Sequence, residues 1–272
     1  MSTFKERIND VKQYEIFSEV AVPEDSHVVL RLLGRNFAKL TTDFNIKPYD
    51  WEFGRAIITA AQSVMFDLSG LYGYISQGQV FILLRKFSPA AGNIRQLERL
   101  TSLASAIATS TFVKETRIWT QFETKVLVFP TTEEVLDYFY LQYELSYARC
   151  ARVYARYALL AKGLSPAEAH QHVVALPVEE LIALFSTPEA FDSEFEAWKR
   201  YGIATYWGES AVGYNQRLHK LPEAQPMSVV VVDKDLPAKD KYYDFLRLKI
   251  QYKAVAGQTP KDAEAFTVAG RY

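Results

Sequence analysis

Apolar and polar residues alternate with two different periods along this chain, and the changes of period separate strands from helices. A β-branched apolar run at 28–33 predicts a strand that ends at Gly34. A second apolar strand is predicted at 71–83, entered through Gly73 and interrupted at Gly78. Between the two, apolar residues recur at helical spacing over 51–69. The first part of the chain is therefore expected to form a strand–helix–strand unit.

The rest of the chain continues in the same way. Helical spacing and turn residues predict helices at 4–17, 95–112, 131–163, 179–185, 189–201 and 240–250, and strands at 122–130, 202–207 and 227–233. The last stretch, 256–272, is polar and Gly-rich and is expected to be extended. The periodicity alone indicates an α+β protein but does not say which strands pair.

Charge and composition argue against several classes of protein. The 272 residues are 49% apolar, enough for a substantial core, and the net charge of -1 provides no global basic field. A bound nucleic acid would need a local basic patch. A single cysteine, Cys150, excludes an internal disulfide and is expected to be a packed thiol. No signal peptide or membrane-length apolar run is present, so a cytoplasmic protein without membrane contact is expected.

The end of the first strand is the clearest candidate for chemistry. The strand stops at Gly34, and Arg35, Asn36 and Phe37 follow it. Backbone amides in such a turn can bind an anion, and a neighbouring basic side chain adds positive potential. The sequence therefore predicts a phosphate-binding turn at these four residues.

At these residues the sequence resembles the tRNA-His guanylyltransferase family and its bacterial and archaeal tRNA-repair relatives, which add nucleotides in the 3′-to-5′ direction. The family's motifs Arg-x-Asp-Gly-Arg-x-Phe and Tyr-Gly-x-Ser-Asp-Glu fall on Arg31 to Phe37 and on Gly73 to Gly78. Segments near 122–130 and 200–215 also resemble the family, the latter most closely its bacterial tRNA-repair branch. The chain is thus identified as a divergent member of that branch.

The family's metal-binding carboxylates are missing. Leu33 stands where the family has its first Asp, and Gln77 and Gly78 replace the Asp-Glu pair. Mg²⁺ requires oxygen ligands, and a Leu and a Gly offer no side-chain oxygen. No catalytic residue and no metal site are therefore predicted. Asp50 and Glu123 are the carboxylates that could substitute if the chain were active.

The resemblance implies further nucleotide-binding positions. The predicted set comprises Gly34, Arg35, Asn36, Phe37, Lys39, Ser76, Arg95 and Arg99. Arg95 and Arg99 belong to a helix that supplies positive charge to the triphosphate in the family. From the residues alone, a solvated helix face is the simpler interpretation of that pair.

The long helix predicted at 131–163 carries tyrosines and arginines at helical spacing. Tyr147, Arg149, Arg152 and Arg156 are candidates either for RNA contact or for a subunit interface, since both surfaces favour these residue types. The interface is the commoner use, and the family assembles as tetramers. A homo-oligomer, dimer or tetramer, or a mixed oligomer with an active relative is therefore expected.

The fold implied by the resemblance is a palm-like, mainly antiparallel sheet of about six strands with helices covering one face. A helical region at about 131–201 is appended to it. The domain division expected is a guanylyltransferase-type domain at 1–220 and a strand–helix extension at 221–272 that packs on the same domain.

Three functions remain open at this point. The leading hypothesis is a pseudoenzyme that keeps RNA or nucleotide binding, or that acts as an oligomer partner. The alternatives are an active 3′-to-5′ nucleotidyltransferase in tRNA 5′-end maturation or repair, and a nucleotide sensor. No cofactor is firmly predicted, since Mg²⁺ and GTP or ATP are needed only by the active alternative. Possible partners are tRNA or another RNA and a nucleoside triphosphate. His170 and His172 lie two residues apart in a helical pattern and predict no metal site.

Overall fold

The structure is a computed structural model, and it describes residues 14–37, 48–86, 95–210 and 227–251. In this part of the chain six strands form one antiparallel sheet in the order β4-β1-β3-β2-β5-β6. The strands are β1 (His27–Gly34), β2 (Gly70–Ser76), β3 (Gln79–Leu84), β4 (Phe122–Phe129), β5 (Ile203–Ser210) and β6 (Met227–Asp233). The predicted fold class, an antiparallel sheet of about six strands flanked by helices, is confirmed.

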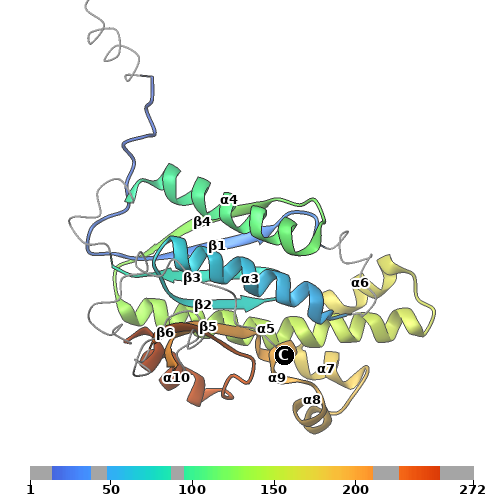
Figure 1. Ribbon diagram of the computed structural model, residues 1–272. Coiled ribbons are helices and arrows are strands. Elements are labelled where there is room, and N and C mark those ends of the chain that lie inside the picture. Colours follow the sequence, from blue (N-terminus) through green and yellow to red (C-terminus); the bar gives the residue numbers. More distant parts are fainter. Residues whose placement is uncertain (1–13, 38–47, 87–94, 211–226, 252–272) are drawn as a thin grey trace, which may run out of the picture.

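Helices cover both faces of this sheet (Figure 1). The helices α3 (Trp51–Asp67) and α4 (Leu97–Thr116) lie on one face, and α5 (Thr132–Ala161) and α10 (Asp240–Ile250) lie on the other. The expectation that helices cover a single face is wrong. Tyr72 and Tyr74 of β2 point away from α3 and are fully buried among residues of α5 and α10. Burying these two large aromatic side chains favours a helical layer on this second face as well.

The second predicted strand is in fact a hairpin. β2 ends at Ser76 and β3 begins at Gln79, so Gln77 and Gly78 form a two-residue turn between antiparallel strands. Both turn residues have positive φ, 49° and 79°, as a type I′ hairpin turn requires. Gly78 is therefore a turn residue and not an interruption within one strand.

The pleat of β1 sends alternate residues to the two cores. Leu30 and Leu32 belong to the core under α3 and α4, whereas Val29 belongs to the core under α5 and α10. Since side chains alternate along a strand, Arg31 and Leu33 lie on the same side as Val29. The family's first metal position therefore belongs to the α5 side of the sheet.

The appended helical region corresponds to α5 and to α6 (Pro166–Val174), α7 (Val178–Ala183), α8 (Pro188–Glu194) and α9 (Ala197–Tyr201). The helices α6, α7 and α8 share a third apolar cluster with the C-terminal half of α5, and Cys150 is fully buried in it, as predicted. The single helix predicted at 189–201 is two helices, because Phe195 adopts an extended conformation between them. Its carbonyl accepts a hydrogen bond from Nε of Arg200 at 2.9 Å.

Two predictions fall mainly outside the described residues. Most of the helix expected at 4–17 lies in 1–13, and the described residues 14–20 contain turns and no helix. The domain boundary expected at 220 lies within 211–226, so the division of the chain stays a prediction; β6 pairs with β5 and extends the same sheet. Among the helices that the structure describes, none has the length and apolar content needed to cross a membrane.

The start of α5 allows a simple stability prediction. Thr131 caps the helix through a capping box: its Oγ1 accepts from the Glu134 amide at 3.2 Å, and the Glu134 carboxylate accepts from the Thr131 amide at 3.1 Å. Thr131→Ala is expected to lower the free energy of unfolding by about 1 kcal/mol, measured by urea denaturation. Thr131→Ser keeps the cap and should lose much less. Equal losses in both variants would contradict the role of the cap.

Candidate functional site

The family's metal positions lie in and beside a row of side chains that crosses four strands, called the metal row below. Leu33 of β1 pairs with Glu123 of β4 on one side and with Gln79 of β3 on the other, and Gln79 pairs with Ser76 of β2. Residues directly opposite each other in an antiparallel sheet point to the same face. The row therefore faces α5, and Leu33 is 41% exposed there. This is the place where a metal-dependent palm would carry its carboxylates.

The residues at the three metal positions cannot hold a divalent cation. Leu33 has no ligand atom, and the side-chain nitrogen of Gln77 donates to the Tyr49 hydroxyl at 2.8 Å and to the Ser146 carbonyl at 3.4 Å. Among the residues that the structure describes, no group of three or more His, Cys, Asp or Glu side chains could bind a metal. His170 and His172 are exposed, in agreement with this. The site does not fit Mg²⁺.

The ring of Phe37 explains why Gly78 has no side chain. A Cβ atom added to Gly78 would lie 2.7 Å from Cδ2 of Phe37, and the φ of 79° disfavours any residue with a side chain. The same ring occupies the space where a Cβ of Gly34 would lie. Phe37 itself packs against Phe53, Phe112 and Phe122, with ring centroids 5.0–5.4 Å apart. The two motif glycines are thus positions where the chain makes room for one aromatic ring.

The carboxylates that could have replaced the missing ones have other partners. Asp50 is the N-cap of α3, and its Oδ1 accepts from the Phe53 amide at 3.0 Å. Asp50 therefore stabilises the start of a helix. Glu123 forms a salt bridge with Arg35, Nε to Oε1 at 3.0 Å. Both carboxylates therefore have partners, and neither is available as an unpaired metal ligand.

The turn after β1 is less open to an anion than its sequence suggests. The Arg35 amide donates to the Gln121 carbonyl at 2.8 Å, so this amide is already used. The Arg35 guanidinium, half-exposed, contacts Glu123 and donates to Gln121 Oε1 at 3.2 Å. Asn36 adopts the left-handed conformation, with φ of 57°. Arg35 is therefore held against β4 by Glu123 and Gln121, at the β4 end of the metal row.

The structure does not bring the two arginines of the α4 region to this turn. Arg95 donates to the Val22 carbonyl and to the Glu24 carboxylate, which fixes the segment before β1. Arg99 is exposed in the first turn of α4. It lies ten residues before Thr109, whose Oγ1 accepts from the Phe122 amide beside the turn. Ten residues of helix correspond to about 15 Å. Lys39 lies outside the described residues.

Two other arginines do approach the metal row. Arg31 lies one row away on the same face, between Lys125 and Phe81, and its Nη2 donates to Gln79 Oε1 at 2.9 Å. Arg149 reaches toward it from α5, and the Arg149 Nη1 atom is buried without a hydrogen-bond partner. Burial, and then the charge of Arg31, lower the pKa of Arg149. Neither arginine has a salt bridge to a carboxylate among the described residues.

Ser76 connects this face to α5. It is buried, and its Oγ donates to Ser146 Oγ at 2.7 Å. The same turn of α5 presents Arg149 three residues later. The predicted candidates Ser76 and Arg149 therefore both lie on the α5 side of the sheet, the side of Leu33, although the sequence predicts different roles for them.

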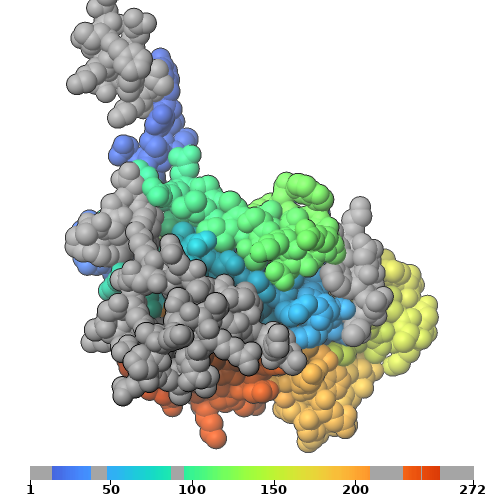
Figure 2. Space-filling model, in the orientation of Figure 1, coloured from blue at the N-terminus to red at the C-terminus, as the bar shows by residue number. Residues whose placement is uncertain are grey.

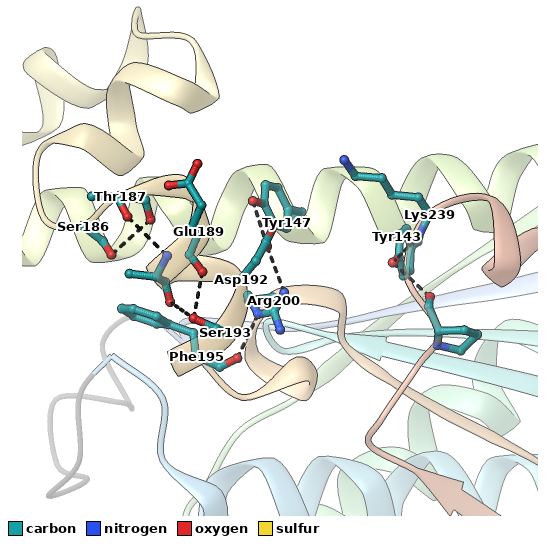
Figure 3. Close-up of polar contacts among 12 residues, drawn as sticks. Tyr143, Tyr147, Ser186, Thr187, Glu189, Asp192, Ser193, Phe195, Arg200 and Lys239 are labelled. Atoms are coloured by element: carbon teal, nitrogen blue, oxygen red, sulfur yellow. Dashed lines mark hydrogen bonds and ion pairs between the residues drawn. The ribbon is translucent and has the colours of Figure 1, made fainter.

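Most of the remaining tyrosines and arginines considered on α5 make contacts within the chain itself. The Tyr147 hydroxyl donates to Asp192 at 3.1 Å, and Asp192 also accepts from Arg200 at 3.0 Å (Figure 3). Arg152 donates to the Val173 carbonyl at 3.3 Å, and only Arg156 of the predicted set is exposed. Tyr143 and Tyr147 both stack on Tyr201. Aromatic residues at helical spacing here pack against the chain's own helices, and the oligomer stays a prediction.

Sequence reasoning missed two residues at this face. Arg31 was recognised only as the first residue of a motif, and Gln79 was not considered. The signal for Arg31 is present in the sequence, because a charged residue in an apolar strand needs a polar partner or an opening. The approach of Arg149 to Arg31 could not be found in this way, since Arg149 belongs to a helix that lies more than a hundred residues further along the chain.

Comparisons with known proteins agree with this geometry. Residues 8–138 match the family described as Thg1, tRNAHis guanylyltransferase. Among solved structures, the chain is similar to a bacterial tRNA(His) guanylyltransferase (Thg1)-like protein in complex with GTP, with 17% identity, a TM-score of 0.68, and coverage of 91% of this chain and 100% of that one. The same title with ATP gives 16% identity, a TM-score of 0.68, and 90% and 98% coverage.

A third structure is more distant. The tRNA(His) guanylyltransferase of Saccharomyces cerevisiae has 14% identity and a TM-score of 0.60, and the match covers 71% of this chain and 90% of that one. At these identities the structural matches establish the fold. No curated protein sequence matches the chain.

Proposed function

We propose that this chain, whose residues 8–138 match the tRNA-His guanylyltransferase family, is a catalytically degenerate nucleotidyltransferase that binds a phosphate-bearing ligand without metal. The ligand class is a nucleoside triphosphate or the 5′-phosphate end of an RNA. Solved relatives of the same fold carry GTP and ATP in their titles.

One observation carries the loss of catalysis. All three carboxylate positions of the palm are filled by residues that cannot hold Mg²⁺, and the third, Gly78, has no space for a side chain. In a two-metal mechanism the ions stabilise the charge on the attacking and leaving oxygens. Without them this chain keeps the scaffold and loses the main source of transition-state stabilisation.

The arginines supply a reason to expect that phosphate binding survives. Arg31 and Arg149 face the same space from the sheet and from α5, and no carboxylate among the described residues neutralises them. The buried Nη1 of Arg149 lacks an acceptor, and a phosphate oxygen is a strong one. Fixed guanidinium groups here replace part of the positive charge that the metals provide in an active palm.

The test is a titration of the full chain with a fluorescent, non-hydrolysable GTP analogue, in EDTA and in Mg²⁺. The dissociation constant is expected to be the same in both and to rise with salt, since charges at a partly open site are screened over about 10 Å at 0.1 M. Arg149→Met should weaken binding by about tenfold, because a charge-assisted hydrogen bond contributes about 1.5–3 kcal/mol.

A matched control is available on the opposite face of the sheet. Arg55 of α3 is exposed and pairs with Glu52, so Arg55→Met removes one charge without touching the site and should leave the constant unchanged. Binding that appears only with Mg²⁺, or no binding in either buffer, would refute metal-free phosphate binding. A role as oligomer partner of an active relative needs no ligand and would survive that second result.

A further inference from the structure

A second surface feature lies away from the metal row, between the C-terminal half of α4 and the start of β4. It is an open groove of about 850 Å³, the size of a small-molecule site. This end of α4 and the loop after it lie at the surface (Figure 2). The walls are formed by Arg35, Ser105, Ala106, Thr109, Ser110, Val113, Lys114, Arg117, Trp119, Gln121, Phe122 and Glu123.

The groove includes charged and aromatic residues that are open to solvent. Lys114 and Arg117 are exposed, and Trp119 is 85% exposed, the highest value among the large apolar side chains that the structure describes. Arg35 also lines the groove and pairs with Glu123. Three cations against one carboxylate leave a local net charge of +2 in a chain whose net charge is -1.

The segment that carries Trp119 is held at both ends. Arg117 ends α4 with a left-handed φ of 61°, and its amide donates to the Val113 carbonyl. The Ile118 amide donates to Thr116 Oγ1 at 3.1 Å, and Thr120 Oγ1 donates to the Arg35 carbonyl at 3.1 Å. A fixed loop thus presents an indole ring to solvent, although hiding that ring would be favourable.

We propose that this groove binds a single-stranded RNA segment, with one base stacked on Trp119 and the flanking phosphates on Lys114 and Arg117. Sequence-tolerant binding of single strands combines an exposed aromatic ring with cations along the backbone path, and both are present here. The hydroxyls of Ser105 and Ser110 add polar groups to the lining that suit sugar and phosphate. A protein partner is a poorer fit for the exposed Lys114, because lysine is depleted in protein interfaces.

The position of the groove agrees with this use. Its lining joins Arg35, in the turn that follows β1, to residues of α4 and to Trp119. The cations proposed for RNA are Lys114 and Arg117, whereas those proposed for the phosphate are Arg31 and Arg149, so RNA binding in the groove does not depend on that proposal. A chain with a net charge of -1 needs a local basic patch to bind RNA. We expect that patch on α4 and the loop after it, and not on the long helix α5.

The experiment is fluorescence anisotropy of the full chain with a labelled ten-nucleotide single-stranded RNA and with the matching duplex. Trp119→Ala is expected to weaken single-strand binding by about tenfold, since stacking of one base contributes about 1–3 kcal/mol, and Trp119→Phe should restore part of it. Lys114→Gln and Arg117→Gln should each reduce the number of counterions released on binding by about one, as read from the slope of log affinity against log salt concentration. The control Arg55→Gln should change nothing.

Three results would overturn the proposal. These are unchanged single-strand binding in Trp119→Ala, equal or tighter binding of the duplex, and a Trp119→Ala variant that changes only the sedimentation coefficient. The last would make the groove an interface between copies of this chain. GTP-analogue binding, measured on the same variants, should remain as in the unmodified protein, which separates this site from the phosphate site.

Discussion

With Mg²⁺, GTP and a tRNA carrying an activated or truncated 5′ end, the purified protein is expected to add no nucleotide. The rate should be at least about 10³-fold below that of the Saccharomyces cerevisiae tRNA(His) guanylyltransferase used as the positive control, because loss of a single charge-stabilising donor already costs 10²–10³ in other enzymes. The measurement is incorporation of labelled nucleotide into the tRNA.

Restoring the motif should not rescue this activity. The triple variant Leu33→Asp, Gln77→Asp and Gly78→Glu replaces the missing carboxylates, but residue 78 has a φ of 79° and its Cβ would meet the Phe37 ring. Strain and overpacking of this kind cost about 1–3 kcal/mol each. The variant is therefore expected to be less stable than the unmodified protein and still inactive.

Controls separate the failure of the site from the failure of the fold. Leu33→Asp with Gln77→Asp alone leaves Gly78 in place and should fold normally, so its inactivity would report on the site. Protein-dependent addition by the unmodified chain would refute the pseudoenzyme. If that addition were abolished by Asp50→Asn or Glu123→Gln, it would establish the alternative with substitute carboxylates.

Phe112→Ala is expected to have the largest effect on stability, a loss of about 3–5 kcal/mol in the free energy of unfolding. Phe112 is fully buried in α4, and its ring contacts those of Phe37, Phe53 and Phe122 with centroids 5.4–5.7 Å apart. Removing it leaves a cavity behind the turn of the first motif. Urea denaturation measures the loss.

The control is Phe112→Leu, which fills most of the space and should lose much less. Because the turn after β1 rests on this aromatic group, Phe112→Ala should also weaken the RNA binding proposed for the groove, to a smaller extent. A loss below about 1 kcal/mol in Phe112→Ala would show that the neighbouring rings close the cavity, and the aromatic group would then not support the turn.

Local sequence pattern determines much of the fold. The helix starting at Trp51, the strand starting at Phe122 and the helix at 240–250 were predicted close to their observed bounds, because each has a clear period and a capping or turn residue at its end. The loss of the metal carboxylates at Leu33, Gln77 and Gly78 was also visible, since it depends only on residue identity.

Only the tertiary structure decided which charged side chains lie close to one another. Arg95 and Arg99 precede and open α4, yet packing of that helix along β4 places them at the end away from the motif turn. Arg31 and Arg149 are 118 positions apart in the sequence and approach each other because α5 crosses the face of β1 to which odd-numbered residues point.

The sequence alone determined that this chain is a divergent palm without its metal ligands, because strand period, turn residues and missing carboxylates are all local properties. It could not determine which hydrogen bonds would occupy Arg35 and Glu123, nor that the Phe37 ring would fill the space beside Gly78. These contacts form between residues that are far apart in the sequence and become neighbours only when the strands pair and α3 and α4 pack on the sheet. Long-range packing, and not residue type, therefore decided which partners these side chains have.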